Sequence, residues 1–442
     1  MSHFIRQLRA RPLRSAVANE SKFYATPRTP DEIRVWQLDQ FNQIWSGISA
    51  RIPFYKALVE ERKMPPRFES WEQFRQVMPI ADRAFVQRKK EELGDPSRPA
   101  DFVRTTGGST SEPVQLPAWR SELDFANADA WLARSWFGID PSDKLFLIWG
   151  HSHQLGKGIR GKINALRRDF KDKLLGYRRW SAYDLSESAV RRAGDALLKF
   201  RPAWIMAYAV ALDQLARVNA DRAKEFAALN LKAALASAES FPRRDSAAQI
   251  ARVLGCRVAM EYGAVESGAI AHQRADSRFQ IFWRHWMVDG LPSADVPGAF
   301  EIFLTSLYPR KFPLIRYQIG DLITEDPNAP AFDQTFASVL GRCNDYISLP
   351  NGTHIHSEAF THAVKECETV GRFQIAQSGT GKISFRYVAA TEDAAVENEI
   401  RRRLTIVHPG LKDVAFEHVA SLPHTIAGKT RTIVREESNE RR

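Results

Sequence analysis

The 442-residue sequence is poor in cysteine and has no long apolar run. Its three cysteines, Cys256, Cys343 and Cys367, lie far apart and form no C-x-x-C pair. This spacing excludes a disulfide framework and predicts a reducing, cytoplasmic location. No stretch of about eighteen apolar residues occurs, so we expect no transmembrane helix and no membrane partner. The length predicts two or three domains.

Acidic residues are scarce in two segments, and the net charge is +11. The first nineteen residues contain four arginines and no acid, which predicts a frayed terminus or a short surface helix, or else a transit-like leader. From Lys157 to Arg179, nine residues are basic and only Asp169 and Asp172 are acidic. An anionic substrate, an acidic protein or a solvated helix face explains this charge. Nucleic acid is less favoured because no nucleic-acid module accompanies it.

Strands alternate with helices between residues 119 and 264, which is typical of a parallel α/β sheet. The segments 30–51 and 82–92 are predicted to be helical before this region. Within it, the predicted helices are 119–137, 186–200 and 211–219, and the predicted strands are KLFLIWG, AWIMAYAV, LKAALASAES and CRVAMEYGA.

The pattern changes after about residue 276. The runs QIFWRHWMV, GAFEIFLTSL and PLIRYQIGDLI predict strands of an antiparallel or barrel-like part. From about Cys343 onward, a β-α-β-β-α-β pattern with helices at 357–366 and 391–405 predicts a small α+β domain. The predicted fold class is therefore α/β, with a large multi-subdomain N-terminal domain and a small C-terminal domain.

Residues 105–113 read TTGGSTSEP and form the most informative local motif. Adjacent glycines let backbone N–H groups approach an anion closely and reach positive φ. The hydroxyl groups of Ser109, Thr110 and Ser111 add further donors. The motif predicts a phosphate-binding loop, and an ordinary polar surface loop is the alternative.

Three later motifs carry polar residues at predicted strand ends or in loops. In EYGAVE, Tyr262 offers a flat face to a base and Glu266 a carboxylate to Mg²⁺, although a turn with a capping acid is the alternative. SAES at 237–240 ends a second strand, so both strand ends can frame one pocket.

In PLIRYQIGD, Asp321 can accept hydrogen bonds from a ribose, and Arg316 can anchor a phosphate, pin the loop or pair with an aspartate. In AGKTR, Lys429 can present an ammonium group to a phosphate or carboxylate.

These motifs occur in the order found in the adenylate-forming enzymes. Together with GRCNDYI at 341–347, they resemble the motifs of the acyl- and aryl-CoA ligases, in the phenylacetate–CoA ligase and CapK-like branch. The resemblance spans residues 105–431. It implies an ATP-dependent, AMP-forming carboxylate ligase that uses Mg²⁺ and coenzyme A. It further implies an adenylation domain at 1–341, a mobile C-terminal domain at 342–442, and a homodimer.

The resemblance also assigns roles to individual residues. Glu266 would hold Mg²⁺ and Lys429 would bridge carboxylate and phosphate, so both are candidate catalytic residues. The remaining candidates would bind ATP: Thr106, Gly108, Ser109 and Thr110 at the phosphates, Glu239, Tyr262 and Gly263 at the adenine, and Asp321 and Arg342 at the ribose.

The sequence departs from the family pattern at three positions. Ser111 stands where the family usually has glycine, Glu112 where it often has lysine, and Asn344 where the hinge has an acid. Glu112 must point away from the phosphates, or another cation must offset its charge.

Substrate and acceptor stay open at the level of sequence. Trp149, His151 and Tyr208 lie where the family lines its acyl pocket, together with Trp131, Trp136 and His153, so an aromatic acid is one candidate. A metal site at His151 and His153 is not favoured because no third ligand is evident. The acceptor can be coenzyme A, an acidic carrier protein or an amine. A non-catalytic protein that binds nucleic acid or an anionic surface is the alternative from another class.

Overall fold

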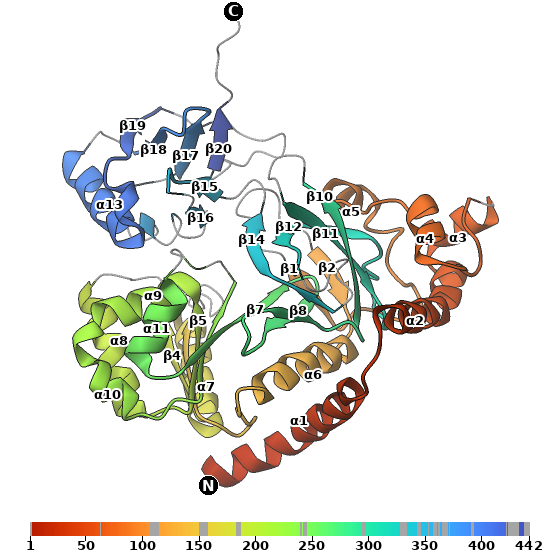
Figure 1. The fold of residues 1–442 in the computed structure, drawn as a ribbon, viewed down its shortest axis with the longest axis horizontal. Coiled ribbons are helices and arrows are strands. Elements are labelled where there is room, and N and C mark those ends of the chain that lie inside the picture. Colours follow the sequence, from red (N-terminus) through yellow and green to blue (C-terminus); the bar gives the residue numbers. More distant parts are fainter. Residues whose placement is uncertain are drawn as a thin grey trace, which may run out of the picture.

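The computed structural model describes most of the chain. The residues outside the description are 1, 62, 106–114, 150–157, 183–186, 239–240, 242–244, 294–297, 328–333, 343–345, 352, 357–359, 361–362, 365–369, 371, 390–392, 421, 423–432 and 437–442. Figure 1 shows the helices of residues 30–89 on one side, a central region of sheets, and the C-terminal domain above a second helical lobe.

The N-terminal region is helical, as predicted. It comprises α1 (Ser2–Ala25), α2 (Pro30–Arg51), α3 (Pro53–Glu60), α4 (Trp71–Val77) and α5 (Arg83–Lys89). The predicted start of α2 is confirmed, because Thr29 and Glu32 form a reciprocal capping box around Pro30. Buried side chains of α2, α4 and the segment between them form an aromatic core that includes Phe41, Trp45, Phe68 and Phe74.

The predicted parallel sheet is confirmed within a sheet of eight strands. Its order is β13-β9-β8-β7-β6-β5-β3-β4, with β4, β3, β5, β6 and β7 parallel. The strands are β3 (Leu145–Trp149), β4 (Tyr177–Ser181), β5 (Trp204–Tyr208), β6 (Ala233–Ser237), β7 (Arg257–Ala264), β8 (Gly268–Gln273), β9 (Phe279–Ile281) and β13 (Thr335–Phe336). The continuous apolar runs suit strands that are buried on both faces.

Helices connect and cover the parallel strands. They are α6 (Ser121–Ser135), α7 (Gly158–Leu175), α8 (Glu187–Phe200), α9 (Ala209–Val218), α10 (Ala223–Ala227) and α11 (Ser246–Leu254). The predicted strand AWIMAYAV was too long, because its last two residues, Ala209 and Val210, begin α9.

A separate antiparallel sheet has the order β10-β11-β12-β14. It consists of β10 (Trp286–Pro292), β11 (Ala299–Ser306), β12 (Tyr317–Thr324) and β14 (Ser338–Arg342). The antiparallel arrangement is confirmed, whereas its closure into a barrel stays a prediction. QIFWRHWMV is not one strand, because a turn in which His285 N–H donates to the Phe282 carbonyl separates β9 from β10. The hairpin of β1 (Phe102–Thr105) and β2 (Gln115–Ala118) brackets the glycine-rich loop.

The C-terminal region has a sheet of its own and a core that includes one residue of α9, Val210. The sheet order is β19 (Ala415–His418), β18 (Ile383–Val388), β17 (Arg372–Ser378) and β20 (Ile433–Glu436), and a hairpin joins β15 (Tyr346–Ser348) to β16 (His354–His356). Its helix α13 (Ala394–Val407) confirms the helix predicted at 391–405. The helix predicted at 357–366 lies mostly outside the described residues. Gln214 of α9 donates to the Ile406 carbonyl at 2.6 Å and joins this region to the larger part.

The basic N-terminus differs from its prediction. It forms the 24-residue helix α1, which packs against α6 and α7 and buries Ala10 and Glu20. Arg14 holds Asp140 in an ion pair of 2.7 Å, which keeps the pKa of Asp140 well below its usual range. Arg6, Arg9 and Arg14 therefore have partners in the folded chain that the local sequence does not reveal. None of the described helices combines the length and the hydropathy that crossing a bilayer requires.

A buried polar cluster joins α1 to α6 and the turn before β10. His285 Nδ1 lies 2.9 Å from both carboxylate oxygens of Asp129, and Arg284 donates to Glu20 at 2.8 Å. Burial raises the pKa of Asp129 from 3.8 to about 6, because the loss of solvent outweighs the attraction of His285.

The raised pKa of Asp129 predicts a dependence of stability on pH. The folded protein binds this proton more tightly than the unfolded chain, so the stabilisation is complete below the unfolded pKa and is lost as pH rises through the folded one. Relative to Asp129→Asn, the free energy of unfolding should fall by about 3 kcal/mol between about pH 4 and pH 7. Urea unfolding at several pH values in this range measures the free energy of unfolding of both proteins. If it changes with pH in the same way in wild type and Asp129→Asn, the raised pKa of Asp129 is contradicted.

Candidate active site

Several candidate residues lie along one edge of the eight-stranded sheet. Trp149, Tyr208 and Ser237 end the neighbouring parallel strands β3, β5 and β6. The rings of Trp149 and Tyr208 are in contact, with centroids 4.2 Å apart. This is the carboxyl edge, where ligands bind in open α/β sheets.

Two hydrogen bonds join the motifs EYGAVE and PLIRYQIGD. The hydroxyl of Tyr262 in β7 donates to Asp321 Oδ2 at 2.7 Å. In the opposite sense, the hydroxyl of Tyr317 in β12 donates to Glu266 Oε1 at 3.2 Å. Each motif thus supplies one tyrosine and one carboxylate, and the two bonds fix the turn after β7 against the second sheet.

Backbone geometry supports this junction. A Cβ atom at Gly263 would lie 2.2 Å from the Gly268 carbonyl oxygen, so a larger residue cannot stand there without a backbone shift. Gly320 has φ of +81°, which glycine adopts without strain just before Asp321. Arg342 of β14 is the register partner of Asp321, so the two residues predicted at a ribose lie on paired strands.

The ring of Tyr262 is more enclosed than the adenine-stacking role suggests. The residue is 8% exposed, and its ring meets Phe336 edge-on at 5.9 Å between centroids. Stacking on a base stays a prediction. The observed contacts make Tyr262 a donor that orients Asp321.

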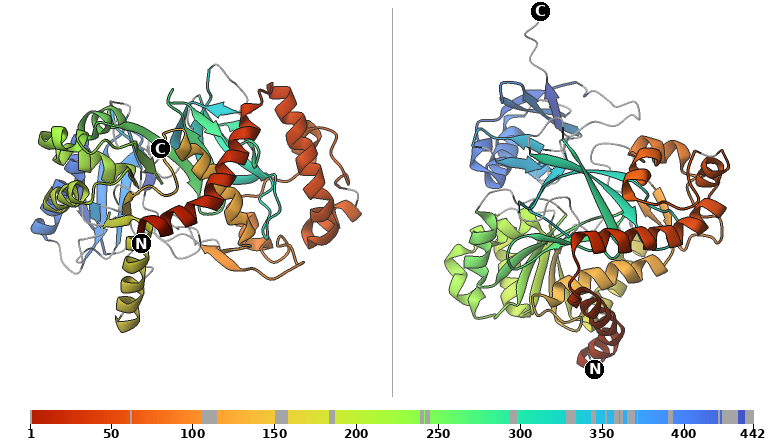
Figure 2. Two further views of the ribbon diagram at one scale, coloured as in Figure 1. Left: turned by 90° about the horizontal axis from the view of Figure 1, so that it is seen from below. Right: turned by 45° about the vertical axis from the view of Figure 1, so that its right-hand side comes forward.

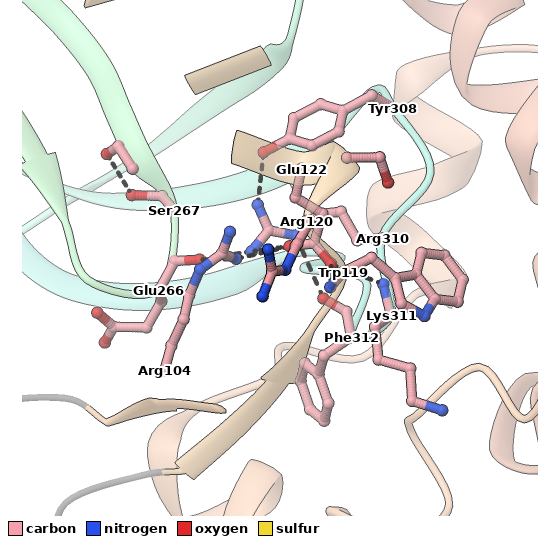
Figure 3. A network of polar contacts seen from close by, with 12 residues as sticks. Arg104, Trp119, Arg120, Glu122, Glu266, Ser267, Tyr308, Arg310, Lys311 and Phe312 are labelled. Atoms are coloured by element: carbon pink, nitrogen blue, oxygen red, sulfur yellow. Dashed lines mark hydrogen bonds and ion pairs between the residues drawn. The ribbon is translucent and has the colours of Figure 1, made fainter. Parts of the chain in front are cut away.

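A buried network of charges fixes the main chain at Glu266 (Figure 3). Arg104 and Arg310 both donate to the Glu266 carbonyl oxygen. Glu122 lies between them, 2.6 Å from Arg104 and 3.6 Å from Arg310. Its second oxygen accepts hydrogen bonds of 2.9 Å from the N–H groups of Trp119 and Lys311. Figure 3 shows the Glu266 carboxylate turned away from this network.

The network contains two guanidinium groups and one carboxylate, so positive charge is in excess. Burial, and next the neighbouring Arg310, lower the pKa of Arg104. Arg104 stands in β1, two residues before the glycine-rich loop at 106–114. An unbalanced buried cation at the base of this loop favours an anion nearby. Sequence reasoning missed this network, because its members lie in separate segments that carry no motif.

Glu261 forms a second buried anchor next to Tyr262. Arg134 of α6 binds both of its oxygens, at 2.7 and 3.1 Å, and this cation lowers the pKa of Glu261 against the opposing effect of burial. His272 lies 3.9 Å from the same carboxylate, and burial lowers the pKa of its imidazole. The Arg134–Glu261 ion pair fastens α6 to β7 ahead of the turn at 265–267.

Arg316 pins a loop, but through carbonyl oxygens and without an ion pair to Asp321. Its Nη1 atom donates to the carbonyls of Arg75 and Met78 at 2.7 and 2.6 Å. Trp131 is buried in the core below the sheet and Trp136 packs beside it, so neither lines the carboxyl edge.

The remaining candidates lie outside the described residues. They are Thr106, Gly108, Ser109, Thr110, His151, His153, Glu239 and Lys429, together with the departures Ser111, Glu112 and Asn344. Of Arg342, the structure describes the main chain.

Comparisons with known proteins support the resemblance seen in the motifs. Residues 347–436 match the family model of the CapK C-terminal domain. The chain is 20% identical to Protein CapK of Staphylococcus aureus, over 89% of this chain and 87% of that protein. The chain thus resembles the adenylate-forming enzymes of the CapK-like branch, as the motifs predicted.

Solved structures share the fold. A 2-hydroxyisobutyryl-CoA ligase in complex with 2-HIB-AMP and CoA is 19% identical, with a TM-score of 0.57 and coverage of 92% of this chain and 90% of that one. An open conformation of that ligase has a TM-score of 0.53 at 19% identity and 91% coverage of both chains. The mixed α/β fold with a separate C-terminal sheet domain is therefore confirmed.

Proposed function

We propose that this chain, which resembles the CapK-like adenylate-forming enzymes, is an ATP-dependent, AMP-forming carboxylate ligase. It activates a carboxylic acid as an acyl adenylate and then transfers the acyl group to coenzyme A. The observation that carries this proposal is the pair of bonds Tyr262–Asp321 and Tyr317–Glu266, since they join two distant motifs of that family where the two sheets meet.

The nucleotide would lie where the two sheets meet. Asp321 accepts hydrogen bonds from the ribose hydroxyls, with Arg342 on the neighbouring strand, and Glu239 and Tyr262 lie near the base. The loop at 106–114 holds the phosphates through its backbone N–H groups and through Ser109 and Thr110. The excess positive charge of Arg104 and Arg310 at the base of this loop offsets Glu112 and attracts the polyphosphate.

The Glu266 carboxylate fits a magnesium ion. The residue is 3% exposed, and in the described part of the chain its carboxylate accepts from the neutral Tyr317 hydroxyl and pairs with no cation. Mg²⁺ is commonly held by one or two carboxylates together with substrate phosphates. When bound, the ion would neutralise phosphate charge. Tyr317 orients the carboxylate, and Arg104 and Arg310 hold the main chain that carries it.

The C-terminal domain would supply Lys429 to the first half-reaction. Its separate sheet, and a core in which Val210 of α9 is, among the described residues, the one residue from the larger part, support a domain, at 342–442, that rotates as a body. The Gln214 bond to Ile406 would break in that rotation. Rotation would bring Lys429 in for adenylation and remove it for acyl transfer. The contacting rings of Trp149 and Tyr208 favour a planar acid at the carboxyl edge.

ATP–pyrophosphate exchange with a panel of aryl, fatty and amino acids tests the proposed function. We expect Mg²⁺-dependent exchange with one class of acid, followed by AMP release when coenzyme A is added. The acyl-transfer step is also measured with a carrier protein or an amine as the acceptor in place of coenzyme A. Absence of exchange with every acid, combined with salt-dependent binding of nucleic acid, would favour a binding protein instead.

Asp321→Asn should lower the exchange rate roughly 10- to 100-fold, because hydrogen bonds to a charged group contribute about 1.5–3 kcal/mol. The exchange rates of wild type and Asp321→Asn are compared at a saturating concentration of the carboxylic acid, over a range of ATP concentrations. Asp289→Asn is the matched control, since Asp289 stands on β10 of the same sheet and pairs with Arg75. Equal exchange rates in Asp321→Asn and wild type would refute the proposed role of Asp321 in nucleotide binding.

A further inference from the structure

Helix α7 turns an apolar stripe toward solvent. Ile163, Leu166 and Phe170, here called the α7 stripe, are 43%, 71% and 66% exposed. Their spacing of three and four residues places them on one face of the helix. A helix of a globular protein normally buries such a face, so this stripe needs a partner.

The opposite face of α7 is the one that meets the protein. Asp172 is 6% exposed and binds Arg179 of β4 at 2.6 Å. The helix therefore meets the protein through this charged pair and through the half-buried Leu174 and Leu175, while the α7 stripe points outward. Figure 2 shows α7 projecting from the body beside the N-terminal end of α1.

Basic residues flank the α7 stripe. Arg167, Lys171 and Lys173 are exposed, and Asp169 is the exposed acid among the described side chains of the helix. Neighbouring α1 exposes Phe4 and Leu8 at 65% and 42%, and its Arg9 donates to Tyr177, two residues after α7. In the described part of the chain, these two helices hold five of the twelve large apolar side chains that are exposed.

We propose that α7 binds the surface of an anionic phospholipid bilayer. A helix with an apolar stripe between lysines and arginines lies in the interface, with its apolar side chains at the acyl boundary and its cations among the headgroups. Such binding needs no spanning segment. The expectation of no membrane partner rested on the absence of a spanning helix, which does not bear on binding at the bilayer surface.

Charge and apolarity together favour a bilayer over nucleic acid and over a second copy of the chain. Nucleic acid would match the cations but leave Leu166 and Phe170 in water. A second copy of the chain would cover the α7 stripe but bring two sets of like charges together, at a cost in free energy. An anionic bilayer satisfies both features at once.

Vesicle co-sedimentation of the full chain tests this proposal. We expect binding to vesicles of phosphatidylcholine with phosphatidylglycerol, no binding to phosphatidylcholine alone, and loss of binding at high salt. The double variant Leu166→Gln/Phe170→Gln should weaken binding at least about tenfold. Lys171→Gln/Lys173→Gln should weaken it about fivefold for each lysine removed.

Val35→Gln is the matched control, because Val35 is 63% exposed on the remote helix α2. It should bind like wild type, and all variants should keep the wild-type melting temperature because these side chains are exposed. Equal binding to neutral vesicles, absence of binding, or equal loss in Val35→Gln would overturn the proposal. So would a dimer in size-exclusion chromatography that Leu166→Gln/Phe170→Gln converts to monomer.

Discussion

Glu122→Ala should lower the free energy of unfolding by about 3–5 kcal/mol, because it removes the anion from a buried ion network. Glu122 is 1% exposed, and its partners Arg104 and Arg310 are 9% and 3% exposed. Without the carboxylate, two guanidinium groups stay buried with no counter-charge. The backbone N–H groups of Trp119 and Lys311 also lose their acceptor. Urea unfolding followed by circular dichroism measures the loss.

Two controls separate the network from general effects of removing a glutamate. Glu60→Ala removes a glutamate from an exposed pair with Lys56 at 3.7 Å, and such pairs contribute roughly 0–1 kcal/mol. Glu122→Gln keeps an acceptor without the charge, so its loss should lie between those of the two alanine variants. If Glu122→Ala costs no more than Glu60→Ala, the buried network does not stabilise the fold.

Lys429→Ala should reduce ATP–pyrophosphate exchange roughly 10²- to 10³-fold, in the range found when a group that stabilises transition-state charge is removed. In adenylation a carboxylate attacks the α-phosphate, so two anionic groups approach each other. The Lys429 ammonium would reduce their repulsion at that step. Acyl transfer from preformed acyl adenylate should change little, because the rotated domain would no longer present this lysine.

Lys429→Arg tests whether charge alone suffices. The guanidinium is larger and planar, so it should restore only part of the exchange rate. Lys382→Ala is the matched control, because Lys382 is exposed between β17 and β18 of the same domain. Unchanged exchange in Lys429→Ala across the acid panel would refute the assigned role. Equal losses in both half-reactions would argue against domain rotation.

Local sequence predicted the elements where the local signal was strong. The helix predicted at 30–51 is α2 at its observed bounds, and the capping box of Thr29 and Glu32 with Pro30 is the local signal that fixes its start. The apolar run LFLIW predicted β3 because a strand buried on both faces needs a continuous apolar sequence. QIFWRHWMV was misread because two short strands of different sheets look like one run when the turn at Phe282–His285 has no glycine or proline.

The candidate site was predictable in its motifs but not in its contacts. Tyr262 and Asp321 are 59 residues apart, and Glu266 and Tyr317 are 51 apart. Arg104, Glu122 and Arg310 were missed for a related reason. Taken singly, each is a charged residue of a kind usually found at the surface, and only burial beside the other two gives it a role.

The sequence alone determined the alternation of helices and strands, the order of the five motifs and the basic composition of α7. These depend on short-range periodicity and residue chemistry. Tertiary structure decided which tyrosine binds which carboxylate, that two arginines hold the Glu266 main chain, and that the α7 stripe points outward. Helical periodicity defines an apolar face, but the packing of the rest of the chain decides whether that face meets the core or the solvent.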